Sequence, residues 1–391
     1  MLQAAEQGGV ARDDGTVAYV STSGERFPVT RALWRAPDGG PLSLSPGSGL
    51  SASGIDRGER SLWRYRAALR VDAARRVSLG EGFTPLLWRP FAGRDVAMKL
   101  EFIAPTGSFK DRGMAVLMTY LKGAGIRHIL EDSSGNAGAS MAAYAAACGM
   151  ACRILVPAAA PAGKLVQMRA MGADVVPVPG TRQDVAEQAL READQVFYAS
   201  HNWQPYFIEG TKTLAFELWE QLGFSVPDVV VVPVGYGSNV LGLRIGFDEL
   251  VRRGEIARMP RIYGVQAANC SALGAAVDAG VDHDVPFDAK PTIAGGIAAQ
   301  KPVRVAEVLA ALRDTGGGLV RVSEEEIVSG LRALLRCGLF VEPTSAAAAA
   351  GLTQLQAGGL LAPGETVVLV LTGSGLKAVP DIENVVAAVP R

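Results

Sequence analysis

Short apolar runs alternate with longer stretches of helical periodicity from about residue 96 onward. The apolar runs are rich in valine, isoleucine and leucine and end at turn residues, which is typical of strands buried on both faces. They are segments 96–101, 127–132, 151–157, 174–178, 228–234, 261–267 and 366–372. The intervening stretches that favour helices are 113–124, 136–148, 161–171, 181–193 and 207–222. This alternation predicts an α/β protein with doubly wound, mainly parallel sheets that helices cover on both faces.

The first 60 residues differ from the rest of the chain. They are rich in glycine, serine and proline and show little periodicity, so we expect them to form an N-terminal extension. The remaining length favours two domains, and no linker separates them, which suggests that the smaller is inserted in the larger. We expect the larger domain to comprise residues 61–110 and 200–391, and the smaller one residues 111–199.

Composition narrows the classes of function. A formal net charge of −1 and an aromatic content of 6% give no reason to expect binding to nucleic acid. The N-terminus lacks the apolar run of a signal peptide, and the longest apolar stretch, 139–152, is too short to cross a bilayer. The cysteines are too few and too scattered for a disulfide scaffold or a metal site: Cys148, Cys152, Cys270 and Cys337. We therefore expect a cytoplasmic protein without a membrane partner or a structural metal.

The segment APTGSFKDRG, residues 104–113, places a lysine at the start of a helix. Ser108 and Asp111 have the spacing of a capping box, and Asp111 suits the positive end of the helix dipole. Lys110 does not, because the dipole disfavours a cation in the first turn. With Arg112 close by, the same field would favour the neutral amine that a Schiff base requires.

Three other loops follow predicted strands, where ligands bind in folds of this kind. One loop, at the start of a helix, allows backbone N–H groups to converge on an anion. Its residues are Gly235, Tyr236, Gly237, Ser238 and Asn239. In the second loop, Asn136 offers a side-chain amide; in the third, Thr372 places a neutral hydroxyl at the end of a strand. Each loop alone is also explained as an ordinary turn, but with a lysine at a helix start they fit pyridoxal phosphate.

These motifs resemble those of the fold type II pyridoxal-phosphate enzymes, and among them those of the threonine synthases. The matching segments are 61–66, 78–86, 105–113, 133–140, 209–217, 233–239, 341–347 and 371–377. The resemblance implies that Lys110 is the catalytic Schiff-base lysine and that Asn136 bonds the 3′-oxygen of the ring. It further implies that residues 235–239 hold the cofactor phosphate and that Thr372 meets the ring nitrogen. A neutral hydroxyl does not hold that nitrogen protonated, which suits elimination and replacement better than transamination.

The chain departs from the threonine synthase pattern in its first residues. Many relatives begin with a zinc ribbon of paired cysteines. Residues 19–46 keep something of that outline but contain no cysteine. We therefore expect a ribbon-like extension without metal ligands.

A second departure concerns the substrate. The family segment N-S-x-N-P-Y-R-x-E-G, which binds the substrate's phosphate, reads HNWQPYFIEG at 201–210. Phe207 takes the place of the arginine, whose bidentate contact with phosphate phenylalanine cannot reproduce. His201 and Asn202 replace the Asn-Ser pair, and Ala137 stands where a hydroxyl residue is usual. A protonated His201 would compensate in part; a neutral one would be structural.

Three classes of function follow. The first is the threonine synthase reaction, which converts O-phosphohomoserine and water to threonine and phosphate; we take it as the best guess. The second is another lyase, either a threonine or serine ammonia-lyase or a β-replacement enzyme. The third, a binding protein without turnover, is disfavoured by the intact Lys110. We expect a small amino-acid substrate and a homodimer. The residues expected at the substrate are Ser133, Ser134, Ala137, His201, Asn202 and Phe207.

Overall fold

The computed structural model describes residues 17–160 and 162–387, which divide into two compact units. Unit 1 comprises Met1–Gly82, described from residue 17, and Lys110–Thr213; unit 2 comprises Phe83–Phe109 and Leu214–Arg391. These boundaries differ from the expected ones, because residues 61–82, Lys110 and residues 200–213 fall in unit 1. The reason is packing, since both segments contribute large side chains to the core of that unit. Those side chains include Leu62, Trp63, Tyr206 and Phe207.

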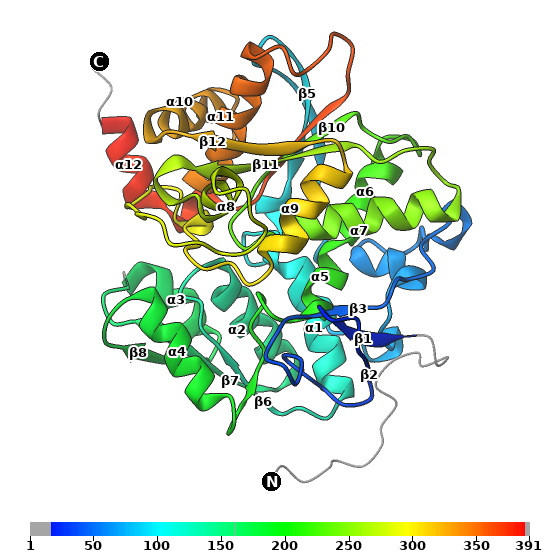
Figure 1. Ribbon diagram of the computed structural model, residues 1–391, viewed down its shortest axis with the longest axis vertical. Helices are drawn as coiled ribbons and strands as arrows, with labels where there is room; N and C mark the ends of the chain where they lie inside the picture. The colour runs from blue at the N-terminus through cyan, green and yellow to red at the C-terminus, as the bar shows by residue number, and fades with distance from the viewer. Residues whose placement is uncertain (1–16, 161, 388–391) are drawn as a thin grey trace. The chain divides into compact units, whose positions relative to one another are not determined.

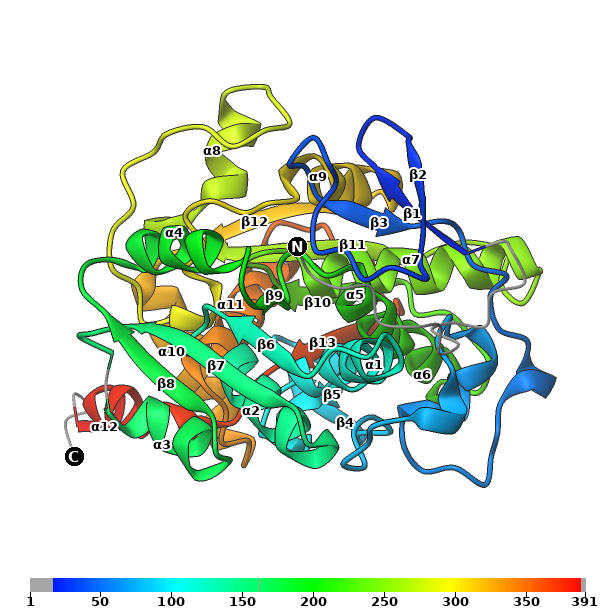
Figure 2. The same ribbon diagram turned by 90° about the horizontal axis from the view of Figure 1, so that it is seen from below.

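Unit 1 contains a four-stranded parallel sheet in the order β8-β7-β6-β9. Its strands are β6 (His128–Glu131), β7 (Ala151–Pro157), β8 (Asp174–Val178) and β9 (Phe197–Tyr198). Its helices are α1 (Lys110–Gly123), α2 (Asn136–Cys148), α3 (Ala162–Ala170), α4 (Arg182–Glu192) and α5 (Pro205–Thr211). Successive residues of β7 face opposite sides, because Ile154 packs in the cluster that contains Met141 of α2, whereas Leu155 packs with Val185 of α4. Figure 2 shows α2 and α3 on one side of this sheet and α4 on the other.

The N-terminal segment, described from residue 17 onward, contributes side chains to the core of unit 1. It forms a three-stranded antiparallel sheet of β1 (Ala18–Ser21), β2 (Arg26–Pro28) and β3 (Leu42–Leu44). Tyr19 of β1 meets the rings of Tyr120 and Tyr206 edge-on at 6.4 and 6.2 Å, and its hydroxyl donates to that of Tyr120 at 2.5 Å. The sequence did not reveal these contacts, because they join residues far apart in the chain.

A buried charged group ties the region before Gly82 to α5. Glu209 accepts from Nε of Arg70 at 3.0 Å and lies 2.9 Å from Nζ of Lys212, which also donates to the carbonyl of Ala68 at 3.0 Å. Burial acts to raise the pKa of Glu209, but the charges of Arg70 and Lys212 lower it from 4.5 to about 2. The carboxylate therefore stabilises unit 1 in its charged form.

Replacing Glu209 with glutamine should lower the free energy of unfolding at pH 7 by about 3 kcal/mol, because the buried Lys212 and the partly buried Arg70 lose their counter-ion. Since the folded-state pKa is depressed, the stabilisation is complete above pH 4.5 and is lost as the pH falls through about 2. Urea unfolding at pH 7 and pH 3 should show the difference from wild type shrinking at the lower pH. The exposed Glu187→Gln on α4 is the matched control, and an equal loss in both variants would contradict the assignment.

Unit 2 contains a six-stranded sheet in the order β12-β11-β10-β13-β5-β4, parallel except for β4. Its strands are β4 (Leu86–Phe91), β5 (Arg94–Leu100), β10 (Val229–Pro233), β11 (Arg261–Ala267), β12 (Gly318–Val322) and β13 (Val367–Leu371). Its helices are α6 (Thr213–Gln221), which begins at the boundary, α7 (Ser238–Arg253), α8 (Ala272–Asp278), α9 (Val305–Asp314), α10 (Glu324–Arg336), α11 (Pro343–Ala357) and α12 (Val379–Ala387). Gly264 of β11 lies against Leu312 of α9, whereas the next residue, Val265, packs against Gly351 of α11. Accordingly, Figure 1 shows α10 and α11 on one face of the sheet and α7 and α9 on the other.

The prediction of an α/β fold with mainly parallel sheets is confirmed, and the seven predicted strands correspond to β5, β6, β7, β8, β10, β11 and β13. The prediction of one helix over 207–222 is wrong, since the segment forms α5 and α6. The break coincides with Thr211 and Thr213, whose hydroxyls donate to the carbonyls of Phe207 at 2.9 Å and Gly210 at 2.7 Å. Such bonds to the preceding turn bend helices.

Two features of the described residues bear on partners. No helix within 17–160 or 162–387 is both long and apolar enough to cross a membrane. Over the same residues, no group of three or more His, Cys, Asp or Glu side chains is arranged to hold a metal ion.

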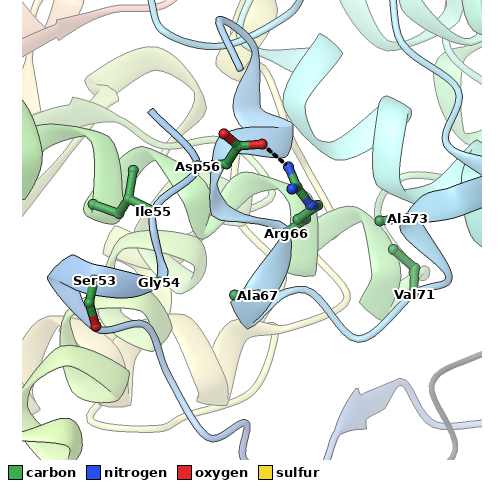
Figure 3. Close-up of a pocket in the computed structure, with 8 residues that line it drawn as sticks. All are labelled: Ser53, Gly54, Ile55, Asp56, Arg66, Ala67, Val71 and Ala73. Carbon is green, nitrogen blue, oxygen red and sulfur yellow. Dashed lines mark hydrogen bonds and ion pairs between the residues drawn. The ribbon is translucent and has the colours of Figure 1, made fainter. Parts of the chain in front are cut away.

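A pocket of about 300 Å³ in unit 1 contains none of the predicted site residues, and its Asp56 and Arg66 pair with each other at 2.5 Å (Figure 3).

Candidate active site

Lys110 is the first residue of α1 and lies beside the ring of Phe207, with its Nζ 5.5 Å from the ring centroid. Two glycines bring α1 and α5 this close. A Cβ on Gly113 would lie 2.5 Å from Cδ2 of Phe207, and one on Gly210 would lie 2.1 Å from the carbonyl oxygen of Arg112. Phe207 is fully buried. The neighbour of Lys110 in unit 1 is therefore an aromatic ring, at the position where the family pattern has an arginine.

The predicted capping box at the start of α1 is wrong. The Oγ of Ser108 is buried and has no hydrogen-bond partner among the residues that the structure describes. The carboxylate of Asp111 instead accepts from Oγ of Ser140 in α2, at 2.6 Å. Asp111 therefore joins two helices of unit 1. Lys110 stands one position nearer the helix start than the capping box implied.

His201 also contacts the Phe207 ring and is oriented by Glu131, the last residue of β6. The rings of His201 and Phe207 meet edge-on at 5.5 Å, and Nδ1 of His201 lies 3.3 Å from Oε2 of Glu131. The same oxygen accepts the backbone N–H of His201 at 3.3 Å, and Oε1 accepts that of Asp132 at 3.0 Å. Burial raises the pKa of Glu131, whereas the backbone N–H groups that it accepts act to lower it. The contact with Nδ1 fixes the orientation of the His201 ring.

The setting of His201 favours the neutral form over the protonated one. Burial, and after it the positive charge of Lys110, hold the pKa of His201 well below its ordinary value of 6.5. Asp132 acts in the opposite direction, but its carboxylate also accepts from NH2 of Arg182 at 2.7 Å. His201 is therefore neutral at physiological pH, and it does not replace the positive charge of the missing arginine.

The remaining predicted residues of unit 1 lie in two turns at the edge of the four-stranded sheet. Ser133 and Ser134 follow β6, and Asn136 and Ala137 begin α2. Both serines and Asn136 are partly exposed, whereas Ala137 is buried. Asn202 follows His201 in the turn after β9 and is also buried. The structure thus brings Lys110, Phe207 and His201 into contact around one ring, and places the serines and Asn136 together in the turn from β6 to α2.

In unit 2, the glycine loop joins the end of β10 to the start of α7. Gly237 is the N-cap of α7 with φ of 92°, a conformation that favours glycine, and a Cβ there would lie 2.1 Å from Cγ2 of Val308. The first turn of α7 contains no acidic residue, and its N–H groups have no acceptor within the helix. Oδ1 of Asn239 is buried without a hydrogen-bond partner among the described residues.

Sequence reasoning missed the glycine pair that faces this loop. Gly235 lies against residues 296 and 297, because a Cβ on it would lie 3.1 Å from Cα of Ile297. The N–H of Gly296 donates to Oγ1 of Thr344 at 3.0 Å, which fixes the pair against the start of α11. The adjacent glycines of the segment AGGI were a usable indication, since paired glycines mark close backbone approaches.

Thr372 lies just past the end of β13, which pairs in parallel with β10, so Thr372 and the glycine loop share one edge of the sheet. Thr372 is almost fully buried. Its N–H donates to Oγ of Ser345 at 2.9 Å, and its carbonyl accepts the N–H of Phe109, the residue before Lys110, at 3.0 Å. Sequence reasoning did not identify Ser345.

The residues of unit 2 fit pyridoxal phosphate. A tight glycine turn, the N–H groups at the start of a helix of 16 residues and the hydroxyl of Ser238 form a donor set for a phosphate. Thr372 adds a neutral hydroxyl at the same edge of the sheet. Oδ1 of Asn239 is a buried acceptor that no described residue pairs with, so a ligand with a donor group would satisfy it. In unit 1, Lys110 supplies an amine in an aromatic setting.

Two doubly wound sheets and this set of loops define a fold type II pyridoxal-phosphate enzyme. The chain belongs to the family of pyridoxal-phosphate dependent enzymes, whose pattern matches residues 77–373. It is 35% identical over 368 residues to threonine synthase of Methanocaldococcus jannaschii, covering 90% of this chain and 91% of that protein. It is 38% identical over 322 residues to threonine synthase of Mycobacterium leprae, covering 80% of this chain and 87% of that protein.

Solved structures show the same fold. A threonine deaminase from T.th. superimposes with a TM-score of 0.63 at 28% identity, covering 74% of this chain and 92% of that one. The processed form of threonine deaminase isoform 2 from Solanum lycopersicum gives a TM-score of 0.67 at 21% identity, covering 78% of this chain and 83% of that one. The protein is therefore a pyridoxal-phosphate dependent enzyme of the lyase type, as the sequence predicted.

Proposed function

We propose that the protein replaces or eliminates a group on the side chain of a small amino acid, and that its reaction is that of threonine synthase. O-phosphohomoserine and water would give threonine and phosphate. The observation that carries the proposal is the 35% identity to a threonine synthase over 90% of the chain. The candidate cofactor residues all lie within residues 77–373, the part of the chain that matches the family.

Pyridoxal phosphate, when bound, withdraws electrons from the substrate and so makes loss of a side-chain group possible. Lys110 would hold the cofactor through Nζ, and the same amine would move the proton at the substrate's α-carbon. Residues 235–239 would bind the phosphate with their N–H groups, Asn136 would orient the ring through its amide, and Thr372 would donate to the ring nitrogen. Phe207 excludes water from the neighbourhood of Nζ, because its buried ring lies 5.5 Å away.

The setting of Phe207 favours a second candidate. A substrate phosphate needs cationic or N–H donors, yet this side of unit 1 offers a buried aromatic ring and a neutral His201. The contact of Nδ1 with Glu131 orients the His201 ring, and a neutral imidazole suits a substrate hydroxyl better than a phosphate dianion, to which it offers no positive charge. The second candidate is therefore ammonia release from threonine or serine.

One assay separates the candidates. The purified holoenzyme is given O-phosphohomoserine, threonine or serine, and phosphate, ammonia and keto acid are followed. We expect phosphate release that matches threonine formation with the first substrate. Ammonia and keto acid from threonine or serine, without phosphate release from O-phosphohomoserine, would select the second candidate and refute the first.

A further inference from the structure

Ser345 connects the start of α11 to the end of β13. It is the third residue of α11 and is fully buried. Its Oγ accepts the N–H of Thr372 at 2.9 Å and the N–H of Gly373 at 3.1 Å. One side-chain oxygen thereby satisfies two consecutive N–H groups beyond the end of the strand.

These two bonds determine which hydroxyl donates in the contact between Ser345 and Thr372. A hydroxyl oxygen has two lone pairs, and both of those on Ser345 are taken by N–H groups. The hydroxyl hydrogen of Ser345 therefore has two acceptors within reach. One is Oγ1 of Thr372, at 3.3 Å, and the other is the carbonyl oxygen of Gly373, at 3.4 Å. In either case Ser345 cannot accept the hydrogen of Thr372. That hydrogen is directed away from Ser345, toward a third group.

The backbone around Thr372 is fixed on both sides. Its carbonyl accepts the N–H of Phe109 at 3.0 Å, and the carbonyl of Gly373 accepts the N–H of Glu342 at 3.0 Å. The N–H of Ser374 donates to the carbonyl of Gly107 at 2.9 Å. With the backbone held, the direction of the Thr372 hydroxyl depends on the torsion about its C–O bond, and Ser345 biases that torsion.

We propose that Ser345 is a positioning residue that makes Thr372 a hydrogen-bond donor and thereby keeps the ring nitrogen of the cofactor unprotonated. An unprotonated pyridine nitrogen accepts a hydrogen bond, whereas a protonated one would meet the hydrogen of Thr372 with its own. Without Ser345, the Thr372 hydroxyl is free to turn and accept. The inference rests on the proposed contact of Thr372 with the ring.

The test uses Ser345→Ala, with Thr353→Ala on the same helix as the matched control, since Thr353 donates to Ala349 within α11. In the absence of cofactor, hydrogen exchange at the amides of Thr372 and Gly373 should be roughly tenfold faster in Ser345→Ala, because each loses its acceptor. In the holoenzyme, the ¹⁵N shift of labelled pyridoxal phosphate should report an unprotonated ring nitrogen in wild type and a partly protonated one in Ser345→Ala. Ser345→Thr, which keeps the hydroxyl, should behave as wild type in both measurements.

Each alternative result is decisive. Unchanged amide exchange in Ser345→Ala would overturn the hydrogen-bond assignment, and faster exchange with an unchanged ¹⁵N shift would overturn the effect on the cofactor. Should Ser345→Ala not fold, Ser345→Cys, whose sulfur is a weak acceptor, gives the same readouts. If wild type binds no pyridoxal phosphate, the proposed function fails and the ring-nitrogen role with it. If the ¹⁵N shift responds but threonine is not formed, only the proposed reaction is wrong.

Discussion

Replacing Lys110 with alanine is expected to reduce turnover by about 10³-fold or more, because the variant loses both the covalent attachment of the cofactor and the group that moves the substrate proton. Borohydride reduction of the wild-type holoenzyme should fix the cofactor on the peptide that contains Lys110. Lys110 is suited to this role because it is half-buried beside the Phe207 ring and has a neutral histidine as its neighbour. Lys212 is not, because it is fully buried and paired with Glu209.

Lys377→Ala is the matched control, since Lys377 is another lysine in a segment that resembles the threonine synthases, 371–377. It should retain the yellow cofactor, the borohydride label and turnover. Unfolding temperatures of the two variants should lie close to that of wild type, which separates loss of chemistry from loss of fold. Label on Lys164, Lys212 or Lys377 in wild type would refute the assignment of Lys110.

The strands and most helices could be predicted from sequence because they depend on local patterns. β7, β8 and β11 coincide with apolar runs bounded by turn residues, and α2 coincides with an alanine-rich stretch. The short β9 was missed because its two residues are held by pairing with β6, which no local pattern reports. The antiparallel sheet of β1 to β3 was missed for a similar reason, since its Tyr19 packs against residues about 100 and 190 positions away.

The candidate site also contains some features that local sequence patterns indicate and others that only tertiary contacts determine. The sequence was enough to place Lys110 at a helix start and the glycine loop and Thr372 at strand ends, because these positions depend on local patterns; their roles at the cofactor stay predictions. Ser345 could not be predicted, because its role depends on where α11 begins relative to β13. The charge of His201 could not be predicted either, because it depends on burial and on Lys110, which is 91 positions earlier in the chain.

Replacing Phe207 with arginine is expected to raise kcat/KM for O-phosphohomoserine, by roughly tenfold to a few hundredfold, with no gain in ammonia release. A charge-assisted contact with phosphate is worth about 1.5–3 kcal/mol, which corresponds to that range. The substitution also has a cost, because it places a cation in a fully buried position, near the amine of Lys110. Without substrate, Phe207→Arg should therefore be less stable than wild type, and O-phosphohomoserine should restore part of that loss.

Phe207→Leu is the matched control, because it removes the aromatic ring without adding charge. It should lose stability through the space left beside Gly113, where the ring now packs, and should not gain phosphate release. The measurement is steady-state phosphate and ammonia release by wild type and both variants with O-phosphohomoserine, threonine and serine. If wild type already processes O-phosphohomoserine efficiently and the arginine impairs it, the buried ring is compatible with a phosphorylated substrate. The donors for that phosphate must then be sought among the N–H groups and hydroxyls of residues 133–137.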